Sequence, residues 1–438
     1  MFPTIYHVFF EWFGVEWHGL KLLNSFGFFV ALAFIFGSWT MNRELRRKQP
    51  FFEMEKRKIT IGAKVNWSEV LINGLIGFIF GWKIIWLFMN SKELFQPGSL
   101  PQEHIFSSQG FPLMGLILGA AFAGWKFWEY KKNELPEPEV KVVDFEKYQY
   151  TGTITLVAAI SGIAGAKFFH LFENPKEFIQ FFSDPTLENF LSGLTIYGGL
   201  ICGGIAVWLW ARRKNIPSFH IMDAAAPGLI LAYGIGRIGC HVSGDGDWGI
   251  ANAAPKPEWL SWLPNWLWSY EYPNNVNAVR GPFEGVFQGG YRGVEIPKVD
   301  PNCKDPFCDG LIDEQIVNIY EGYGTYLDPG VFPTPVYETT MALLTFALLW
   351  YLRKRIRIPG MIFAIWMIFN GLERFFVEKI RVNNISEFWS KIGLEVTQAE
   401  VISTTFVLVG VAFAIFLWKF QNKLPKYPKL VGSWNQPS

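Results

Sequence analysis

The most prominent pattern along this chain is a series of long apolar stretches separated by shorter polar segments. About nine of these stretches approach the roughly 20 apolar residues that a helix needs to cross a bilayer. Several contain glycine, which membrane helices use for close packing. They run over residues 22–40, 68–88, 110–128, 153–172, 195–211, 222–239, 337–352, 360–377 and 399–418. The pattern predicts an all-α polytopic membrane protein with about nine transmembrane helices.

Basic residues alternate between the polar segments that join these stretches. Lys and Arg gather after the first, third, fifth, seventh and ninth stretches, as at Arg46, Lys131, Arg213, Arg355 and Lys423, and are sparse elsewhere. Cytoplasmic loops of membrane proteins carry an excess of Lys and Arg. The alternation therefore predicts an amino terminus outside the cytoplasm and a cytoplasmic carboxyl terminus. The first ten residues lack the pattern of a cleaved signal peptide.

Residues 240–336 are the longest part of the chain without an apolar stretch, and we expect them to form one long extracytoplasmic loop. Trp259, Trp262, Trp266 and Trp268 indicate an interfacial aromatic cluster, although a small folded cap would have the same composition. The predicted division is an amino-terminal segment with the first span (1–67), a helical hairpin (68–152), core spans (153–239), the loop or cap (240–336), and core spans with a cytoplasmic tail (337–438).

Composition narrows the class of protein further. The 438 residues include 39 Lys and Arg against 38 Asp and Glu, a formal charge of +1, which gives no reason to expect a nucleic-acid partner. Charged residues make up only 18%, below the roughly 25% of soluble domains, and the mean hydropathy is +0.18. Four cysteines exclude a disulfide framework, but Cys303 and Cys308 could form a local disulfide if their loop lies outside the cytoplasm.

An internal repeat joins two pairs of the apolar stretches. Residues 68–128 match residues 152–212 at a constant offset of 84 positions without gaps. Both hairpins are predicted to run from inside to outside and back, so the repeat is parallel and not the inverted type common in transporters. The identical pairs are Gly81/Gly165, Lys83/Lys167, Leu87/Leu171, Phe88/Phe172, Asn90/Asn174, Lys92/Lys176, Glu93/Glu177, Gln96/Gln180, Gly115/Gly199 and Gly119/Gly203.

Polar residues within the apolar stretches gather near one side of the membrane. Ionisable groups in spans are costly and are functional candidates by default. Each one alone has an alternative explanation, either snorkelling to the interface or a structural ion pair such as Arg237 with Glu378. As a set at one depth they favour a site at the outer leaflet. They are Lys83, Lys167, Tyr197, Arg237, Glu373, Arg374, Glu378 and Arg381.

The densest motif is the glycine-rich segment 234–249, Gly-Ile-Gly-Arg-Ile-Gly-Cys-His-Val-Ser-Gly-Asp-Gly-Asp-Trp-Gly. It starts at the end of the sixth apolar stretch and presents His241, Asp245 and Asp247 in a turn-forming sequence. A calcium loop would need more alternating oxygen ligands and a distal Glu. A nucleotide-binding loop would need a preceding strand and a Gly-Lys-Ser/Thr sequence, which the segment lacks.

With this motif the chain resembles the prolipoprotein diacylglyceryl transferase family of bacterial inner membranes. Four blocks carry the resemblance, and their order agrees with the predicted topology. They are Gly-Ala-Lys-Phe-Phe-His (165–170), Ser-Gly-Leu-Thr-Ile-Tyr-Gly-Gly-Leu (192–200) with its basic end at 210–217, the signature from 226 to 249, and Pro-Thr-Pro-Val-Tyr-Glu (333–338) joined with Gly-Leu-Glu-Arg-Phe-Phe-Val-Glu-Lys-Ile-Arg (371–381).

The chain departs from the family pattern in several places. Tyr197 stands where the family has a His, Phe26 where the first span usually has a Tyr, and Cys240 where the signature has an Asn. The acidic part of the signature is the longer Asp-Gly-Asp of 245–247. The family has seven spans, and the duplicated hairpin accounts for the two additional ones. These departures are compatible with a divergent branch of the same activity and with an altered one.

The resemblance implies a reaction and roles for particular residues. The family moves a diacylglyceryl group from phosphatidylglycerol to the lipobox cysteine thiol of a prolipoprotein signal peptide, which yields a thioether and glycerol phosphate. Arg237 and Arg374 would bind the phosphate and stabilise the leaving group, with Lys167 as a third cation and Glu378 orienting an arginine. Gly198 and Gly199 would leave room for the lipid headgroup.

The group that activates the thiol is less clearly marked. Tyr197 could carry the proton, but a phenol has an ordinary pKa near 10, so we favour a role in positioning the phosphate. His241, Asp245 or Asp247 would then supply the base. The resemblance implies no metal and no organic cofactor.

A second hypothesis is a lipid-binding or transport protein that uses the same arginines without chemistry. The acidic pair of the signature and the lack of charge at the membrane midplane favour the enzyme.

Overall fold

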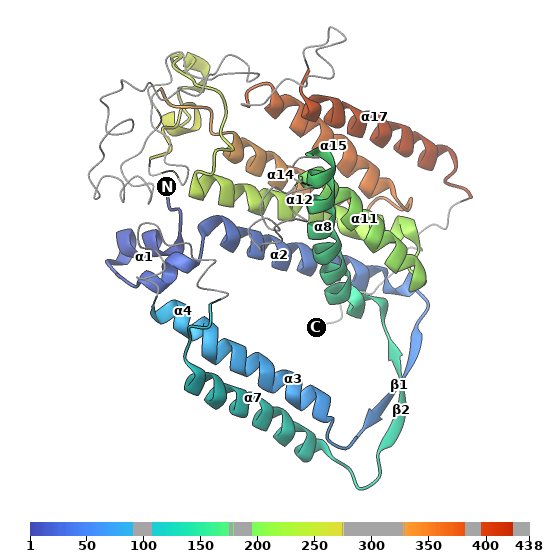
Figure 1. The fold of residues 1–438 in the computed structure, drawn as a ribbon. Coiled ribbons are helices and arrows are strands. Elements are labelled where there is room, and N and C mark those ends of the chain that lie inside the picture. Colours follow the sequence, from blue (N-terminus) through green and yellow to red (C-terminus); the bar gives the residue numbers. More distant parts are fainter. Residues whose placement is uncertain are drawn as a thin grey trace.

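The computed structural model describes residues 1–90, 107–174, 178, 195–273, 275, 327, 329–381 and 396–423. Over these residues the protein is mostly helical (Figure 1), and a helix lies at each of the predicted apolar stretches. Following the short α1 (Ile5–Phe13), the main helices are α2 (Ser25–Lys48), α3 (Trp67–Ile79) continued by a π-helical turn and α4 (Ile85–Met89), α7 (Pro112–Asn133), α8 (Thr151–Glu173), α11 (Ile196–Arg213), α12 (Ser218–Ser243), α14 (Thr334–Leu352), α15 (Met361–Glu378) and α17 (Gln398–Lys419).

Within the described residues, five of these helices are long and apolar enough to cross a membrane. They are α2, α3 with α4, α8, α12 and α17. The protein is therefore a helical membrane protein, as the hydropathy pattern predicted.

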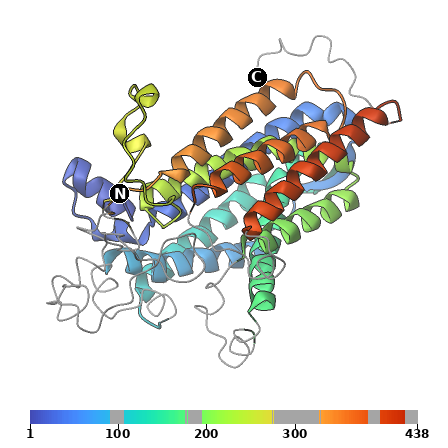
Figure 2. The ribbon, with the colours of Figure 1, turned by 90° about the horizontal axis from the view of Figure 1, so that it is seen from above.

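Helix α12 lies at the centre of the main bundle and packs against α2, α14, α15 and α11 (Figure 2). Small residues permit the close approach. A Cβ atom at Gly228 would lie 2.8 Å from the carbonyl oxygen of Gly37, and one at Gly239 would lie 2.9 Å from the Cβ of Phe29. Membrane helices commonly pack through such small residues. The signature glycines thus position α12 tightly against its neighbours.

The repeat is preserved in three dimensions as identical helix–helix contacts. Phe111 N–H donates to the carbonyl of Trp82 at 2.8 Å, and Thr195 N–H, 84 positions later, donates to the carbonyl of Ala166 at 3.1 Å. A Cβ atom at Gly81 would clash with the carbonyl of Met114, and one at Gly165 would clash with the carbonyl of Gly198. The hairpins α3–α7 and α8–α11 therefore pack in the same register.

The repeat also includes two strands that the hydropathy pattern did not predict. Strands β1 (Glu55–Ile61) and β2 (Glu139–Phe145) precede the two hairpins and are 84 positions apart. The two strands pair antiparallel. At the centre of the ribbon Lys58 pairs with Val142, the residue that occupies the same position in the second repeat. This pairing is unchanged when the two repeats are exchanged, so a local two-fold axis passes through the ribbon. Figure 1 shows the α3–α7 hairpin beside the bundle, joined to it at one end by this ribbon.

The segment between α12 and α14 contributes a small packed cap, of which residues 248–273 and 329–333 are the main described parts. Gly249 N–H donates to the carbonyl of Phe332 at 2.8 Å, and Tyr270 and Val331 exchange backbone hydrogen bonds of 2.9 and 3.0 Å. Trp248, Tyr272, Leu327 and Val331 form its buried core. We call this end of the bundle the cap end and the opposite end, which carries the strands, the ribbon end. Cys303 and Cys308 lie outside the described residues.

Candidate active site

The buried carboxylate of Glu338 collects three arginines at the cap end. Glu338 lies in the first turns of α14, is the only charged residue of that helix, and has no exposed side-chain surface. Its oxygens lie 3.0 Å from Arg237 Nε, 3.3 Å from Arg374 and 3.4 Å from Arg381. A fully buried carboxylate persists only when it is paired and hydrogen-bonded. Glu338 therefore holds guanidinium groups from α12, from α15 and from the residues after α15 in one place.

A second carboxylate, Asp247, ties the cap to the same arginines. It accepts a hydrogen bond from Arg237 and forms an ion pair with Arg381. Its backbone carbonyl accepts a hydrogen bond of 2.8 Å from the hydroxyl of Thr334, at the start of α14. The neighbouring Gly249 forms an isolated bridge with Arg381. The glycine-rich turn after α12 is thereby fixed over the three arginines, which we call the arginine cluster (Arg237, Arg374 and Arg381).

Arg374 is held from both sides and is the most accessible of the three arginines. Its second nitrogen lies 3.0 Å from Glu378, which also accepts a 2.7 Å hydrogen bond from Thr397. The Arg374 side chain is 23% exposed, compared with 13% for Arg237 and 11% for Arg381. Each guanidinium carries five N–H groups. The carboxylates thus orient Arg374 and leave it within reach of a ligand.

Tyr197, in the first turn of α11, lies close enough to Arg374 for the two side chains to interact electrostatically, which extends the cluster to a fourth helix. This places the residue where the family pattern has a His directly beside a predicted phosphate ligand.

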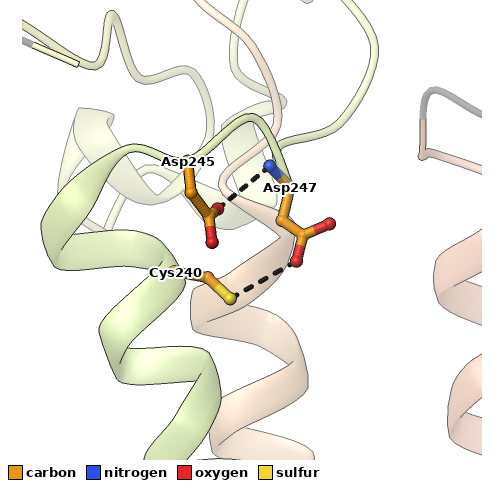
Figure 3. A group of neighbouring side chains, drawn as sticks. All are labelled: Cys240, Asp245 and Asp247. Atoms are coloured by element: carbon orange, nitrogen blue, oxygen red, sulfur yellow. Dashed lines mark hydrogen bonds between the residues drawn. The ribbon is translucent and has the colours of Figure 1, made fainter. Parts of the chain in front are cut away.

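Cys240, Asp245 and Asp247 form a compact group at the end of α12 (Figure 3), and their side-chain donor atoms lie within 4.8 Å of one another. The Cys240 thiol donates to Asp247 at 3.3 Å, and the Asp247 N–H donates to the Asp245 carboxylate at 3.3 Å. Burial raises the pKa of Asp245 above its ordinary value. This group does not fit a metal site well, because Asp247 already binds two guanidinium groups whose charge would repel a cation.

The structure does not bring every predicted residue into this site. His241 turns toward the cap, where its Nδ1 lies 3.2 Å from the hydroxyl of Tyr272 and its ring packs near Trp266 and Tyr270. Its observed contacts are therefore those of a residue that holds the cap on α12.

The expected space for a headgroup beside Gly198 and Gly199 is filled by α8. A Cβ atom at Gly198 would lie 2.5 Å from the Cβ of Phe169, and one at Gly199 would lie 3.1 Å from the carbonyl of Gly162. The two glycines serve helix packing, because the face of α11 that carries them is the face that contacts its repeat partner.

Lys167 is buried on α8, with 5% of its surface exposed. Its repeat equivalent, Lys83, donates to the carbonyls of Ser107 and Gln109 at 2.6 and 2.8 Å. In the first hairpin this lysine therefore holds the connection between the two helices.

Sequence reasoning did not single out Glu338 and Tyr233 as site residues. Tyr233 lies one turn before Arg237, and its hydroxyl is 3.0 Å from Glu338 and 3.2 Å from Glu373. The signal for Glu338 was present, since it is the one charge in an otherwise uncharged helix of 19 residues.

The family model described as prolipoprotein diacylglyceryl transferase matches residues 115–416 and so includes the whole arginine cluster. The chain belongs to this family. Residues 1–114, with α2 and α3, lie outside the match.

Individual relatives are similar at moderate identity. The phosphatidylglycerol–prolipoprotein diacylglyceryl transferase of Bifidobacterium adolescentis is 29% identical over 269 residues, 60% of this chain and 64% of the relative. The protein of the same name from Corynebacterium efficiens is 27% identical over 261 residues, 59% and 65% of the two chains. That from Dehalococcoides mccartyi is 24% identical over 308 residues, 70% and 88% of the two chains. The chain thus spans just under two thirds of the first two relatives.

Proposed function

We propose that this chain transfers a diacylglyceryl group from phosphatidylglycerol to the lipobox cysteine thiol of a prolipoprotein signal peptide. The observation that carries the proposal is the arginine cluster, three guanidinium groups oriented by buried carboxylates, within a chain of this family. The relatives named above carry the name of this activity. The lipid bilayer would supply phosphatidylglycerol and would hold the apolar region of the signal peptide.

The reaction is a displacement at the glyceryl carbon that is bonded to the phosphate oxygen. The peptide sulfur forms a bond with that carbon, the carbon–oxygen bond breaks, and glycerol phosphate leaves with both electrons. The thiol proton passes to a base, and the product is a thioether. Negative charge develops on the leaving phosphate oxygen, and preoriented donors aimed at such charge are commonly the largest contribution to catalysis.

Arg374 and Arg237 are assigned to the phosphate. Arg374 is the more exposed donor, and Glu338 and Glu378 fix its plane. Planar guanidinium groups bind phosphate through paired hydrogen bonds, which suits both binding and leaving-group stabilisation. Asp247 and Glu338 act as positioning residues because they hold Arg237 without needing contact with the lipid.

Asp245 is assigned as the base that accepts the thiol proton. Among the acidic pair it is Asp247, not Asp245, that forms the ion pairs with Arg237 and Arg381. Burial raises the pKa of Asp245, which brings the basicity of this carboxylate closer to that of a thiolate. A general base is most effective when its pKa lies near the working pH.

Tyr197 is assigned to positioning through its contact with Arg374. We expect Tyr197→Phe to cost about 1–3 kcal/mol of transition-state stabilisation, because one hydrogen bond to a charged group is lost. Tyr197→His is expected to keep substantial activity, since imidazole can also donate a hydrogen bond. Steady-state transfer kinetics measure both variants. An inactive Tyr197→Phe enzyme beside a normal Asp245→Asn enzyme would assign the proton transfer to Tyr197 instead.

We also infer that the helices make nine spans in a bacterial inner membrane, with the amino terminus and cap outside and the ribbon and carboxyl terminus in the cytoplasm. The alternation of basic segments and the positions of the helices support this topology.

Cysteine labelling tests the topology. A membrane-impermeant maleimide added to intact spheroplasts is expected to label Ser261→Cys in the cap, and to label Lys141→Cys in the ribbon only after lysis. Both signals are read above the background of the native cysteines in the unmodified chain. The reverse accessibility of the two positions would invert the orientation.

The activity itself is tested with purified protein, phosphatidylglycerol and a lipobox peptide, read by mass spectrometry. The expected product is the peptide with the mass of one diacylglyceryl group on its cysteine, together with glycerol phosphate. Tight binding of phosphatidylglycerol without any modified peptide would favour the lipid-binding protein over the transferase.

A further inference from the structure

A cavity of about 520 Å³ lies between the cap and α14, outside the arginine cluster. Its walls come from the cap (Leu260, Leu263, Leu267 and Trp268), from the outer face of α14 (Val336, Thr340 and Met341), and from Phe332 and Ile380. The lining is almost wholly apolar.

The two largest polar side chains of the lining are already bonded to the cap. Lys256 donates to the carbonyl of Leu263 at 2.5 Å, and the Tyr337 hydroxyl donates to the carbonyl of Leu267. These bonds turn the polar ends of both side chains to the cap backbone. The cavity is therefore suited to an apolar group.

The cavity and the candidate active site share a wall. Phe332 lines the cavity, and two residues later Thr334 donates to the carbonyl of Asp247. Ile380 lines the cavity, and the next residue, Arg381, belongs to the arginine cluster. The backbone of Gly249 and Ile250 crosses between the two segments with hydrogen bonds of 2.8 and 2.9 Å to Phe332 and Ile380. Only one layer of residues would thus separate an apolar group in the cavity from the arginine cluster and Asp247.

The cavity also lies at the same level along α14 as Glu338, which holds the arginine cluster. Val336 and Met341 lie on either side of Glu338 along α14, within about 3–5 Å of it along the helix axis. The cavity extends along α14 for only about 7.5 Å at 1.5 Å per residue. One turn further toward the ribbon end the same helix face is open, and Leu344 is 65% exposed there.

We propose that this cavity binds an apolar side chain of the peptide substrate, from the segment that directly precedes the modified cysteine. This inference rests on the proposed function. A signal peptide carries its apolar region immediately before its processing site. An extended chain advances about 3.3–3.6 Å per residue, so a residue a few positions before the thiol reaches a cavity adjoining the site.

An acyl chain of the lipid fits the cavity less well. Acyl chains run from the headgroup toward the bilayer midplane over about 15 Å, half of the roughly 30 Å apolar core. The cavity is shorter than that and is covered by the cap.

The test fills the cavity and measures each substrate separately in mixed micelles. We expect Thr340→Trp to raise KM for the peptide about tenfold or more, the range for losing an apolar group from its pocket, with kcat and KM for phosphatidylglycerol within about twofold of wild type. The matched control is Leu344→Trp, which adds the same side chain to the same helix face outside the cavity and should leave both KM values unchanged.

A second measurement does not depend on a folded variant. A peptide with a photoactivatable leucine just before its cysteine is expected to crosslink wild-type protein within 260–268 or 336–341. Crosslinks confined to other segments, an unchanged peptide KM in Thr340→Trp, or a raised KM for the lipid alone would each overturn the inference. A wild-type protein that modifies no peptide would overturn the proposed function itself.

Discussion

Arg374→Ala is expected to lower kcat/KM for diacylglyceryl transfer by about 10²–10³, the usual loss when one donor to a developing negative charge is removed. Arg374 is the most exposed member of the arginine cluster, and two buried carboxylates fix its orientation. The variant also leaves Glu338 and Glu378 with one partner fewer. Arg237→Ala is expected to have an effect of similar size. Transfer assays at saturating peptide, with thermal stability measured in detergent, separate lost catalysis from lost folding.

Lys379→Ala is the matched control for this prediction. Lys379 has the same charge, lies five residues after Arg374, and binds Glu400 outside the cluster. It should keep transfer activity near that of wild type. An Arg374→Ala protein that folds and transfers at the wild-type rate would remove Arg374 from the mechanism.

Asp245→Asn is expected to lower kcat/KM by about 10²–10⁴, the usual contribution of a general base. Asp245 must be ionised to accept the thiol proton, so activity should fall as the pH is lowered through its pKa. Burial raises that pKa, so the acidic limb of the pH profile should lie above the ordinary Asp value of about 3.9. Asp245→Asn should abolish this limb, which a merely structural role would not do.

Glu258→Gln, an exposed cap carboxylate, is the control for the loss of one acidic group. Its pH profile should match that of wild type. If Asp245→Asn retains both its rate and its acidic limb, the proton goes to another acceptor, and Tyr197 becomes the first alternative.

Much of the candidate site could be predicted from the sequence. The apolar stretches placed the helices, the offset of 84 positions identified the two hairpins, and the charges at one depth marked Arg237, Arg374 and Glu378. These features depend on length, periodicity and the cost of burying a charge, which are all properties of a local segment.

Other predicted placements differ from the contacts in the structure, because they depend on which way a helix faces. Gly198 and Gly199 were expected to face a headgroup, yet they face α8, and His241 was placed with Asp245 although it packs in the cap. Strands β1 and β2 escaped prediction because each is exposed and gains its stability from a partner 84 positions away.

The sequence by itself determined the class of protein, the helices, the repeat and the arginines, because apolar length and charge act within each segment. Only the tertiary structure decided which arginine forms an ion pair with which carboxylate. Arg237 could have met Glu378, but the packing of α12 on α14 gives it Glu338 at 3.0 Å, and Glu378 binds Arg374 on its own helix. A buried ion pair forms where the rotation and crossing of two helices bring opposite charges together, and those depend on the side chains of every neighbouring helix at once.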